Sequence, residues 1–271
     1  MSDHGARSPE RIALLGGVYS NYLALEAVIA DAREQGATKI YCLGDLGAFG
    51  PFPDRAIEIL RKHQIETVRG NYDDSIGRGL ADCQCGYTDE RDNHFARLSY
   101  EYTFKNTSAT SREFLRSLPP EIRFEVHGVR VLLCHGSPRK MNEFVWESTS
   151  STHFLEYLAR QHAADVVCTT HTGIAWQRTL SEGRLWLNVG AIGRPPNDGL
   201  TSILYALLDF FPKTMPTARA TLRRVAYDHE RLAVEMRAEQ LPEEFIETIL
   251  TGWWTTCLEI LPAKERSRGR H

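Results

Sequence analysis

The sequence lacks the features that would place it in a membrane, a secretory pathway or a nucleic-acid complex. No apolar run reaches the roughly 18 residues needed to span a bilayer, and the first ten residues, MSDHGARSPE, contain no apolar core of a signal peptide. The formal net charge is only −3, and the basic residues near the C-terminus are few. We therefore expect a cytoplasmic protein with no membrane partner and no strong nucleic-acid signal.

A disulfide framework is also missing. The six cysteines are scattered, and Cys42, Cys134 and Cys168 lie inside apolar runs, which predicts buried, reduced thiols. Cys83 and Cys85 form a C-x-C pair in a polar segment. The pair is compatible with a soft-metal or redox role, but two loop thiols without a second pair are a weak signal.

No internal repeat and no linker rich in Pro, Gly or Ser divides the 271 residues, so we expect one globular domain. Its predicted limits are 11–252, with an insertion at 74–120, after a disordered N-terminus at 1–10. Residues 253–271 are expected to form a C-terminal tail that is mobile at its charged end. The Trp253-Trp254 pair would dock this tail onto the body or onto a partner. The oligomeric state stays open, with a homo-oligomer as one option.

Apolar strand patterns alternate with amphipathic helix patterns, which favours an α/β layer with parallel strand pairing. Expected strands are 11–16, 39–44, 65–70, a hairpin over 123–134 that turns at His127-Gly128, 165–169, 184–189, 201–209 and 219–226. Expected helices are 22–35, 54–63, 93–105, 110–118, 150–161, 228–238 and 242–251, while 74–92 is expected to be a loop.

Four polar side chains follow the ends of four separate predicted strands: Asp45, Asn71, His135 and His171. Each alone has an ordinary explanation, because Asp and Asn often begin turns and a single His is more often structural than a ligand. Strand ends in α/β sheets converge on ligand sites, however. One carboxylate, one amide and two imidazoles together suit Mn²⁺, Fe²⁺ or Zn²⁺. The convergence favours a metal site over coincidence.

The segments GDLGAFGP, GNYD, HGSP and a late HT followed by NVGAIGRP resemble, in this order, the calcineurin-like metallophosphoesterases, and in particular their bacterial phosphodiesterase branch. The resemblance runs from about residue 11 to 252. It implies a four-layer αββα sandwich of two mixed β-sheets. It also implies hydrolysis of a phosphomonoester or phosphodiester, such as a small molecule or nucleotide, by water that two metal ions activate.

The chain departs from that family at the positions devoted to the first metal. The family's Asp-x-His in the first turn is replaced by Gly17 and Tyr19, and the last His of its G-H-T-H segment is replaced by Gly173. Tyr72 stands where the family's G-N-H segment has a histidine that acts on the substrate. Gly17 and Gly173 are therefore expected to face a common cavity that is open on one side.

The ligands of the second metal are all retained, and they include the shared carboxylate Asp45, together with Asn71, His135 and His171. If the ligands had been lost without functional constraint, both metal sites would have lost residues. The observed pattern therefore predicts a phosphoesterase with an atypical, single-ion site in which Asp45 is also catalytic. The alternative is an inactive binding or scaffold protein on the same fold. Both interpretations remain open at this point.

Five further residues are candidates for roles around this site. Tyr19 could bind a metal or take part in catalysis, although simple filling of vacated space is favoured. His94 could replace the missing acid, although capping of its helix by the nearby Asp92 is the simpler role for that segment. Asn21, Arg69 and Arg194 are candidates for substrate binding, the last because a guanidinium can hold phosphate oxygens.

Overall fold

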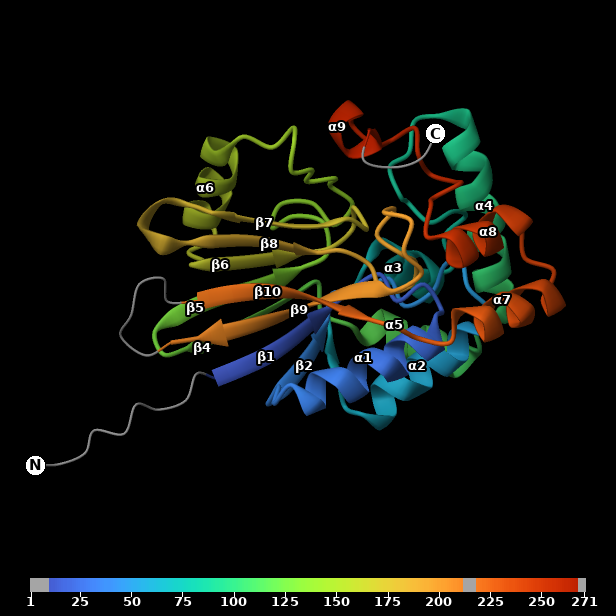
Figure 1. Ribbon diagram of the computed structural model, residues 1–271, viewed down its shortest axis with the longest axis horizontal. Helices are drawn as coiled ribbons and strands as arrows, with labels where there is room; N and C mark the ends of the chain where they lie inside the picture. The colour runs from blue at the N-terminus through green and yellow to red at the C-terminus, as the bar shows by residue number, and fades with distance from the viewer. Residues whose placement is uncertain (1–9, 212–217, 268–271) are drawn as a thin grey trace, which may run out of the picture.

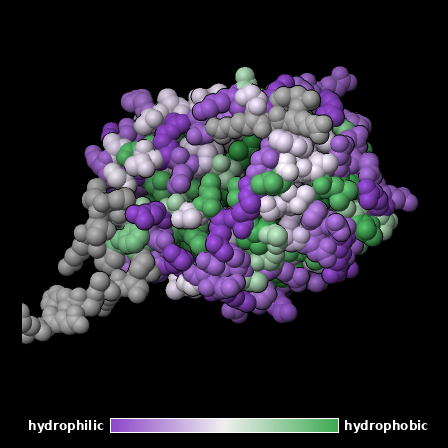
Figure 2. Space-filling view, in the orientation of Figure 1, coloured by the Kyte–Doolittle hydropathy of each residue, from purple (hydrophilic) through white to green (hydrophobic). Residues whose placement is uncertain are grey.

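The computed structural model describes residues 10–211 and 218–267. The predicted disorder of the N-terminus falls on residues outside this range, except that Glu10 already belongs to the first strand. None of the described helices is long and apolar enough to cross a membrane. Figure 2 shows polar residues over most of the face in view, with apolar residues in smaller patches between them.

Two five-stranded mixed sheets pack face to face, as the family resemblance implied. The first sheet has the order β10-β9-β1-β2-β3, where β1 is Glu10–Leu15, β2 Lys39–Cys42, β3 Glu66–Thr67, β9 Ile203–Phe210 and β10 Ala218–Val225. The second has the order β4-β5-β6-β8-β7, where β4 is Glu121–Val126, β5 Val129–Cys134, β6 Val166–Thr169, β7 Ala175–Thr179 and β8 Leu185–Val189. β1 runs parallel to β2 and antiparallel to β9, and β6 runs parallel to both β5 and β8.

The alternation of side chains along the strands divides the core into layers. In β1, Ile12 and Leu14 pack between the two sheets, whereas Ala13 and Leu15 pack under the helices on the outer face. In the second sheet, Trp186 belongs to the cluster beneath α6 on its outer face. Two sheets covered by outer helices make the αββα sandwich (Figure 1).

Among the described α-helices, α3 and α9 were not predicted, and the others follow the predicted amphipathic segments closely. Their bounds are α1 Tyr22–Glu34, α2 Pro53–Lys62, α3 Asn71–Arg78, α4 Glu90–Asn106, α5 Ala109–Ser117, α6 Thr152–Gln161, α7 His229–Ala238, α8 Glu243–Thr251 and α9 Ala263–Arg266. In Figure 1, α1 and α2 lie along the first sheet and α6 lies beside the second, while α7 and α8 gather at one end.

Three local predictions were wrong. Part of the expected loop at 74–92 belongs to α3, because Asp73 accepts a hydrogen bond from the backbone of Gly70 and caps the helix start. α4 begins at Glu90, and its N-cap is Asp89 rather than Asp92. The edge strand β7 was missed, because only Trp176 in its five residues is fully buried and the alternation is weak.

The charged end of the chain is packed rather than mobile as far as residue 267, the last described residue of the tail. Glu265 is 2% exposed and accepts hydrogen bonds from the backbone and hydroxyl of Ser148. Asp92 accepts from the backbone of Ile260 at 2.9 Å. Trp254 is buried against the body, and its indole donates to the carbonyl of Pro195 at 2.6 Å. Within the described residues, Trp254 thus docks the tail onto the body.

This packing predicts unequal roles for the two neighbouring tryptophans. Trp254→Ala should lower the free energy of unfolding by about 3–5 kcal/mol, because it opens a buried cavity and removes a hydrogen bond. Trp253→Ala, at the partly exposed neighbour, is the matched control and should cost less than half as much. Urea unfolding followed by circular dichroism measures both, and equal losses would contradict the docked tail.

Candidate metal centre

The sheet topology brings the ends of three strands to one place. β2 ends at Cys42, three residues before Asp45, while β5 ends at Cys134 and β6 at Thr169, just before His135 and His171. β5 and β6 are parallel neighbours, so the two histidines leave the second sheet at the same edge. The loop after β2 lies against them, because the carbonyl of Leu43 is 2.7 Å from His135 Nδ1.

Asp45, His135 and His171 form a compact buried cluster. His135 Nε2 is 3.2 Å from Asp45 Oδ2 and 3.1 Å from His171 Nδ1, and the three ligand atoms lie within 4.8 Å of one another. An ion about 2.1 Å from two ligand atoms would hold them roughly 3.0–3.4 Å apart, depending on the coordination angle. The spacing therefore fits direct coordination of one ion.

The electrostatics of the cluster suit a cation. The backbone carbonyl of Leu43 can only accept a hydrogen bond, so His135 Nδ1 is protonated and donates to it. His135 Nε2 then faces the cluster. Burial and the neighbouring His135 lower the pKa of His171 to about 3, so His171 is neutral. Burial opposes the ionisation of Asp45, but the attraction and hydrogen bond of His135, together with His171 and the backbone N–H of Tyr72, lower the pKa of this carboxyl.

Both Asp45 and His171 have a left-handed backbone, with φ of 57° and 31°. This region is unfavourable for residues other than glycine, and Asp and His are among the more tolerant exceptions. Such conformations cluster at functional sites, where the surrounding structure enforces them. The strand-to-loop turns are therefore shaped to aim these two side chains at a common point.

Asn71 lies beside the cluster at the start of α3. The backbone N–H of the next residue, Tyr72, donates to Asp45 Oδ1 at 3.1 Å. The amide nitrogen of Asn71 donates to the carbonyl of Cys83 at 2.8 Å, which leaves its oxygen for another partner. That oxygen is buried and accepts no hydrogen bond from the described residues. An unsatisfied buried acceptor is costly, and a cation is the ligand it suits.

Asp73 is a supporting residue to which the sequence analysis gave no role. Its carboxylate accepts from the backbone N–H groups of Asp45 at 2.8 Å, Leu46 at 2.9 Å and Gly70 at 2.8 Å. It therefore ties the loop of Asp45 to the helix start that carries Asn71. Burial and the charge of Asp45 raise the pKa of Asp73 to about 6. Its position third in a helix, within GNYD, is the signal that could have identified it.

The region beside Gly17 and Gly173 is filled, which corrects the expectation of an open cavity. A Cβ atom at Gly17 would lie 2.7 Å from Ala191 and 3.0 Å from the ring of Tyr19. A Cβ atom at Gly173 would meet the ring of Trp254 at 3.1 Å and the guanidinium of Arg194 at 3.6 Å. Burial raises the pKa of Tyr19 above its usual value, so the phenol is neutral and space-filling.

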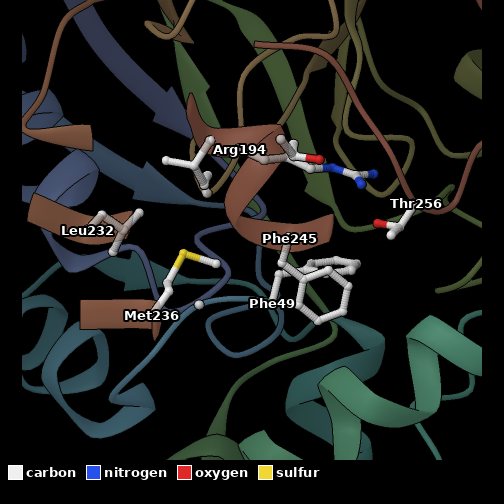
Figure 3. Close-up of a pocket in the computed structure, with 10 residues that line it drawn as sticks. Phe49, Arg194, Leu232, Met236, Phe245 and Thr256 are labelled. Carbon is white, nitrogen blue, oxygen red and sulfur yellow. The ribbon is translucent and has the colours of Figure 1, made fainter. Parts of the chain in front are cut away.

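Arg194 is buried among aromatic rings at this place, with 6% of its surface exposed. Its guanidinium carbon lies 3.4 Å from the ring centre of Trp254 and 5.1 Å from that of Phe49. Figure 3 shows the side chain leaving a small apolar cavity and extending away from Leu232 and Met236. No carboxylate in the described parts of the chain forms an ion pair with it, and Nε has no hydrogen-bond partner there.

The other predicted site residues have visible structural roles. Asn21 caps α1 by accepting from Ala24 at 3.0 Å and donates to the carbonyl of Gly193 at 3.2 Å. Arg69 pairs with Asp74 at 3.4 Å. His94 is exposed on α4, whereas the metal-site cluster is buried. Asn21 thus supports the loop of Arg194, and the structure does not bring His94 into the cluster.

The cysteines divide into two groups. Cys42, Cys134, Cys168 and Cys257 are free and buried, which confirms the prediction for the first three. Cys83 and Cys85, for which the sequence left a soft-metal or redox role open, are joined by a disulfide. The C-x-C spacing was the available signal, but it could not show that the pair lies against Asn71.

Comparison with known proteins finds similar proteins over most of the chain. An uncharacterized protein of Methanocaldococcus jannaschii is 26% identical over 255 residues, which cover 89% of this chain and 98% of the relative. The crystal structure of a metallophosphoesterase from Sphaerobacter thermophilus has 27% identity and a TM-score of 0.66, covering 90% of this chain and 99% of the other. A hypothetical protein of Pyrococcus horikoshii shares the fold, with 21% identity and a TM-score of 0.73 over 90% of this chain and 99% of that one.

The family model of the calcineurin-like phosphoesterase superfamily domain matches residues 11–210, from the first strand to the end of β9. This range contains the whole cluster of Asp45, His135 and His171 and the turn that carries Arg194. The chain therefore belongs to the calcineurin-like phosphoesterase superfamily.

Proposed function

We propose that this protein is a phosphoesterase that works with a single divalent ion held by Asp45, Asn71, His135 and His171. The observation that carries the proposal is the buried cluster in which three ligand atoms face one another, with the unpaired oxygen of Asn71 beside it. Imidazole, carboxylate and amide donors suit Mn²⁺, Fe²⁺ or Zn²⁺. When bound, such an ion polarises a phosphoryl oxygen and lowers the pKa of water.

Arg194 supplies the second positive charge of the site in this proposal. The family's first-metal positions are replaced by Gly17 and Gly173, and the guanidinium lies beside the second of these. A buried guanidinium without a carboxylate partner can hold two oxygens of a phosphate group through charge-assisted hydrogen bonds. Arg194 thus orients the phosphate and stabilises its charge. The substrate class is a small phosphomonoester or phosphodiester, including nucleotides.

Tyr19 and His94 take no direct chemical part in this mechanism. Tyr19 is a neutral phenol that fills the space next to Gly17 and contacts the side chain of Arg194, with 5.8 Å between guanidinium carbon and ring centre. Asp45 has the catalytic role in this proposal, because its ionised carboxylate would be a ligand of the ion together with His135 and His171. Asn21 acts through the loop of Arg194, whose Gly193 carbonyl it binds.

A second function, ligand binding without turnover, is favoured by one observation. All four proposed ligands are at most 8% exposed in this conformation. A hydrolase must admit its substrate, so the enclosed state suits a protein that uses the fold for binding or assembly. The activity measurements below separate the two functions, because they require turnover and not only metal uptake.

His171→Ala should abolish binding of the ion while leaving the fold intact, because the two sheets and their helices bury the core without it. Metal that binds only the folded state should raise the stability of the wild type by about 2.7 kcal/mol at a hundredfold excess over Kd. Melting curves with and without Mn²⁺ should then differ for the wild type and for the control His153→Ala, on the exposed face of α6, but not for His171→Ala. If His171→Ala lowers the melting temperature of the metal-free protein as much as that of the protein with Mn²⁺, His171 has a structural role and is not a metal ligand.

Arg194→Lys should reduce kcat/KM for phosphate esters by about 10–100-fold, since a single ammonium cannot reproduce the two-pronged contact of a guanidinium. Arg33→Lys, on the exposed surface of α1, is the matched control and should retain activity. The assay is a panel of phosphomonoesters and phosphodiesters with Mn²⁺, Fe²⁺ and Zn²⁺. An unchanged kcat/KM in Arg194→Lys would show that Arg194 does not bind the phosphate of the substrate.

Asp45→Asn should eliminate metal-dependent turnover in the same assay, because the neutral amide cannot supply the negative charge that the ion and His135 require. Turnover that survives this change would refute the single-ion mechanism. A wild type that binds the ion and turns over no ester in the panel would favour the binding function.

A further inference from the structure

We propose that Cys83 and Cys85 form a redox modification site that controls access to the metal centre. In this proposal the disulfide holds residues 81–87, the cover segment, closed over Asn71 and His171, and reduction to two thiols releases it. The inference rests on the proposed metal site and adds the control of that site.

The cover segment touches the proposed ligands directly. The amide nitrogen of Asn71 donates to the carbonyl of Cys83 at 2.8 Å and contacts the sulfur of Cys85 at 3.5 Å. The cover segment reaches His171 through Phe144, whose ring contacts those of both His171 and Tyr87. Both halves of the disulfide are therefore packed on metal-site residues, and the bond fixes the carbonyl and the sulfur that Asn71 contacts.

The cover segment is also held from its other side. Asn142 donates to the carbonyl of Gln84 at 2.7 Å, between the two cysteines. The ring of Phe144 lies 4.3 Å from the ring of His171 and 5.8 Å from that of Tyr87. The loop that follows β5 thus clamps the cover segment at the disulfide and packs on the metal-site histidine.

A pocket of about 560 Å³ lies against the cover segment. It is lined by residues 81–87 together with Asn93, Arg97, Tyr100 and Asn142. A volume in this range accommodates a small organic ligand. Cys83 and Cys85 line this pocket while Asn71 contacts them from the buried side, so the cover segment separates the pocket from the metal centre.

The chemistry requires only a dithiol reductant. Its thiolate attacks one sulfur of the Cys83–Cys85 bond and forms a mixed disulfide, and its second thiol then displaces the remaining protein sulfur. Two electrons and two protons pass to the protein, which gains two thiols, and the reductant becomes a cyclic disulfide. The freed segment can move away from Asn71, because the covalent link that fixes Cys85 beside Cys83 is gone.

The test is the rate at which a chelator removes Mn²⁺ from the loaded protein. Protein treated with dithiothreitol should lose the ion about tenfold faster than oxidised protein. The reason is that the disulfide no longer restrains the local opening of the cover segment. Intact mass and peptide mapping should show the oxidised protein to be two hydrogen atoms lighter, with the bond between Cys83 and Cys85.

The double variant Cys83→Ser, Cys85→Ser should release the ion quickly in both conditions. Cys42→Ala, in β2, is the matched control and should keep the redox response of the wild type. Equal release rates from oxidised and reduced wild type would contradict the proposal that the disulfide regulates access to the metal. The proposal of the metal site itself would not be affected. Failure to load Mn²⁺ in either state would overturn the metal site itself, and the proposal with it.

Discussion

The buried contact between the carboxylate of Asp45 and the imidazole of His135 is the constraint on which the site depends. Burying an ionised carboxylate is costly unless a positive charge and hydrogen bonds compensate it. His135 provides that charge only in its protonated form, while His171 stays neutral beside it. The divalent ion that we propose would compensate Asp45 more fully if the same atoms coordinated it. The supporting bonds of Asp73 and Leu43 keep the geometry ready for it.

The second constraint is the burial of Arg194. The resemblance implies that other members of the family bind a first metal near the positions of Gly17 and Gly173. Here Tyr19 and Trp254 fill this volume with aromatic rings, and Arg194 brings a fixed positive charge into it. We infer that the chain replaces one cation by another. The exchange removes the need for Asp and His ligands, and it keeps a charge that can attract a phosphate.

Much of the fold could be predicted from the sequence because its layers depend on local patterns. β1 and α1 follow directly from apolar periodicity, and the His127-Gly128 turn follows from hairpin chemistry. β7 could not be predicted, because an edge strand with one buried residue carries almost no pattern. The packing of the tail was also hidden, since the burial of Glu265 depends on Ser148, far away in the chain.

The candidate site shows the same division. The convergence of Asp45, His135 and His171 follows from where the strands end, so residue type and position sufficed. The filling of the first-metal region by side chains could not be predicted from the sequence, because glycines indicate space without showing which side chain enters it. The disulfide at Cys83 and its contact with Asn71 likewise require the path of the cover segment.

The central claim is that this chain holds one divalent ion where its relatives' pattern implies two. Calorimetric titration of metal-free, reduced protein with Mn²⁺ tests it most directly, supported by elemental analysis of the loaded protein after gel filtration. The account predicts a single class of sites and one ion per chain. Two ions per chain, or none, would contradict it.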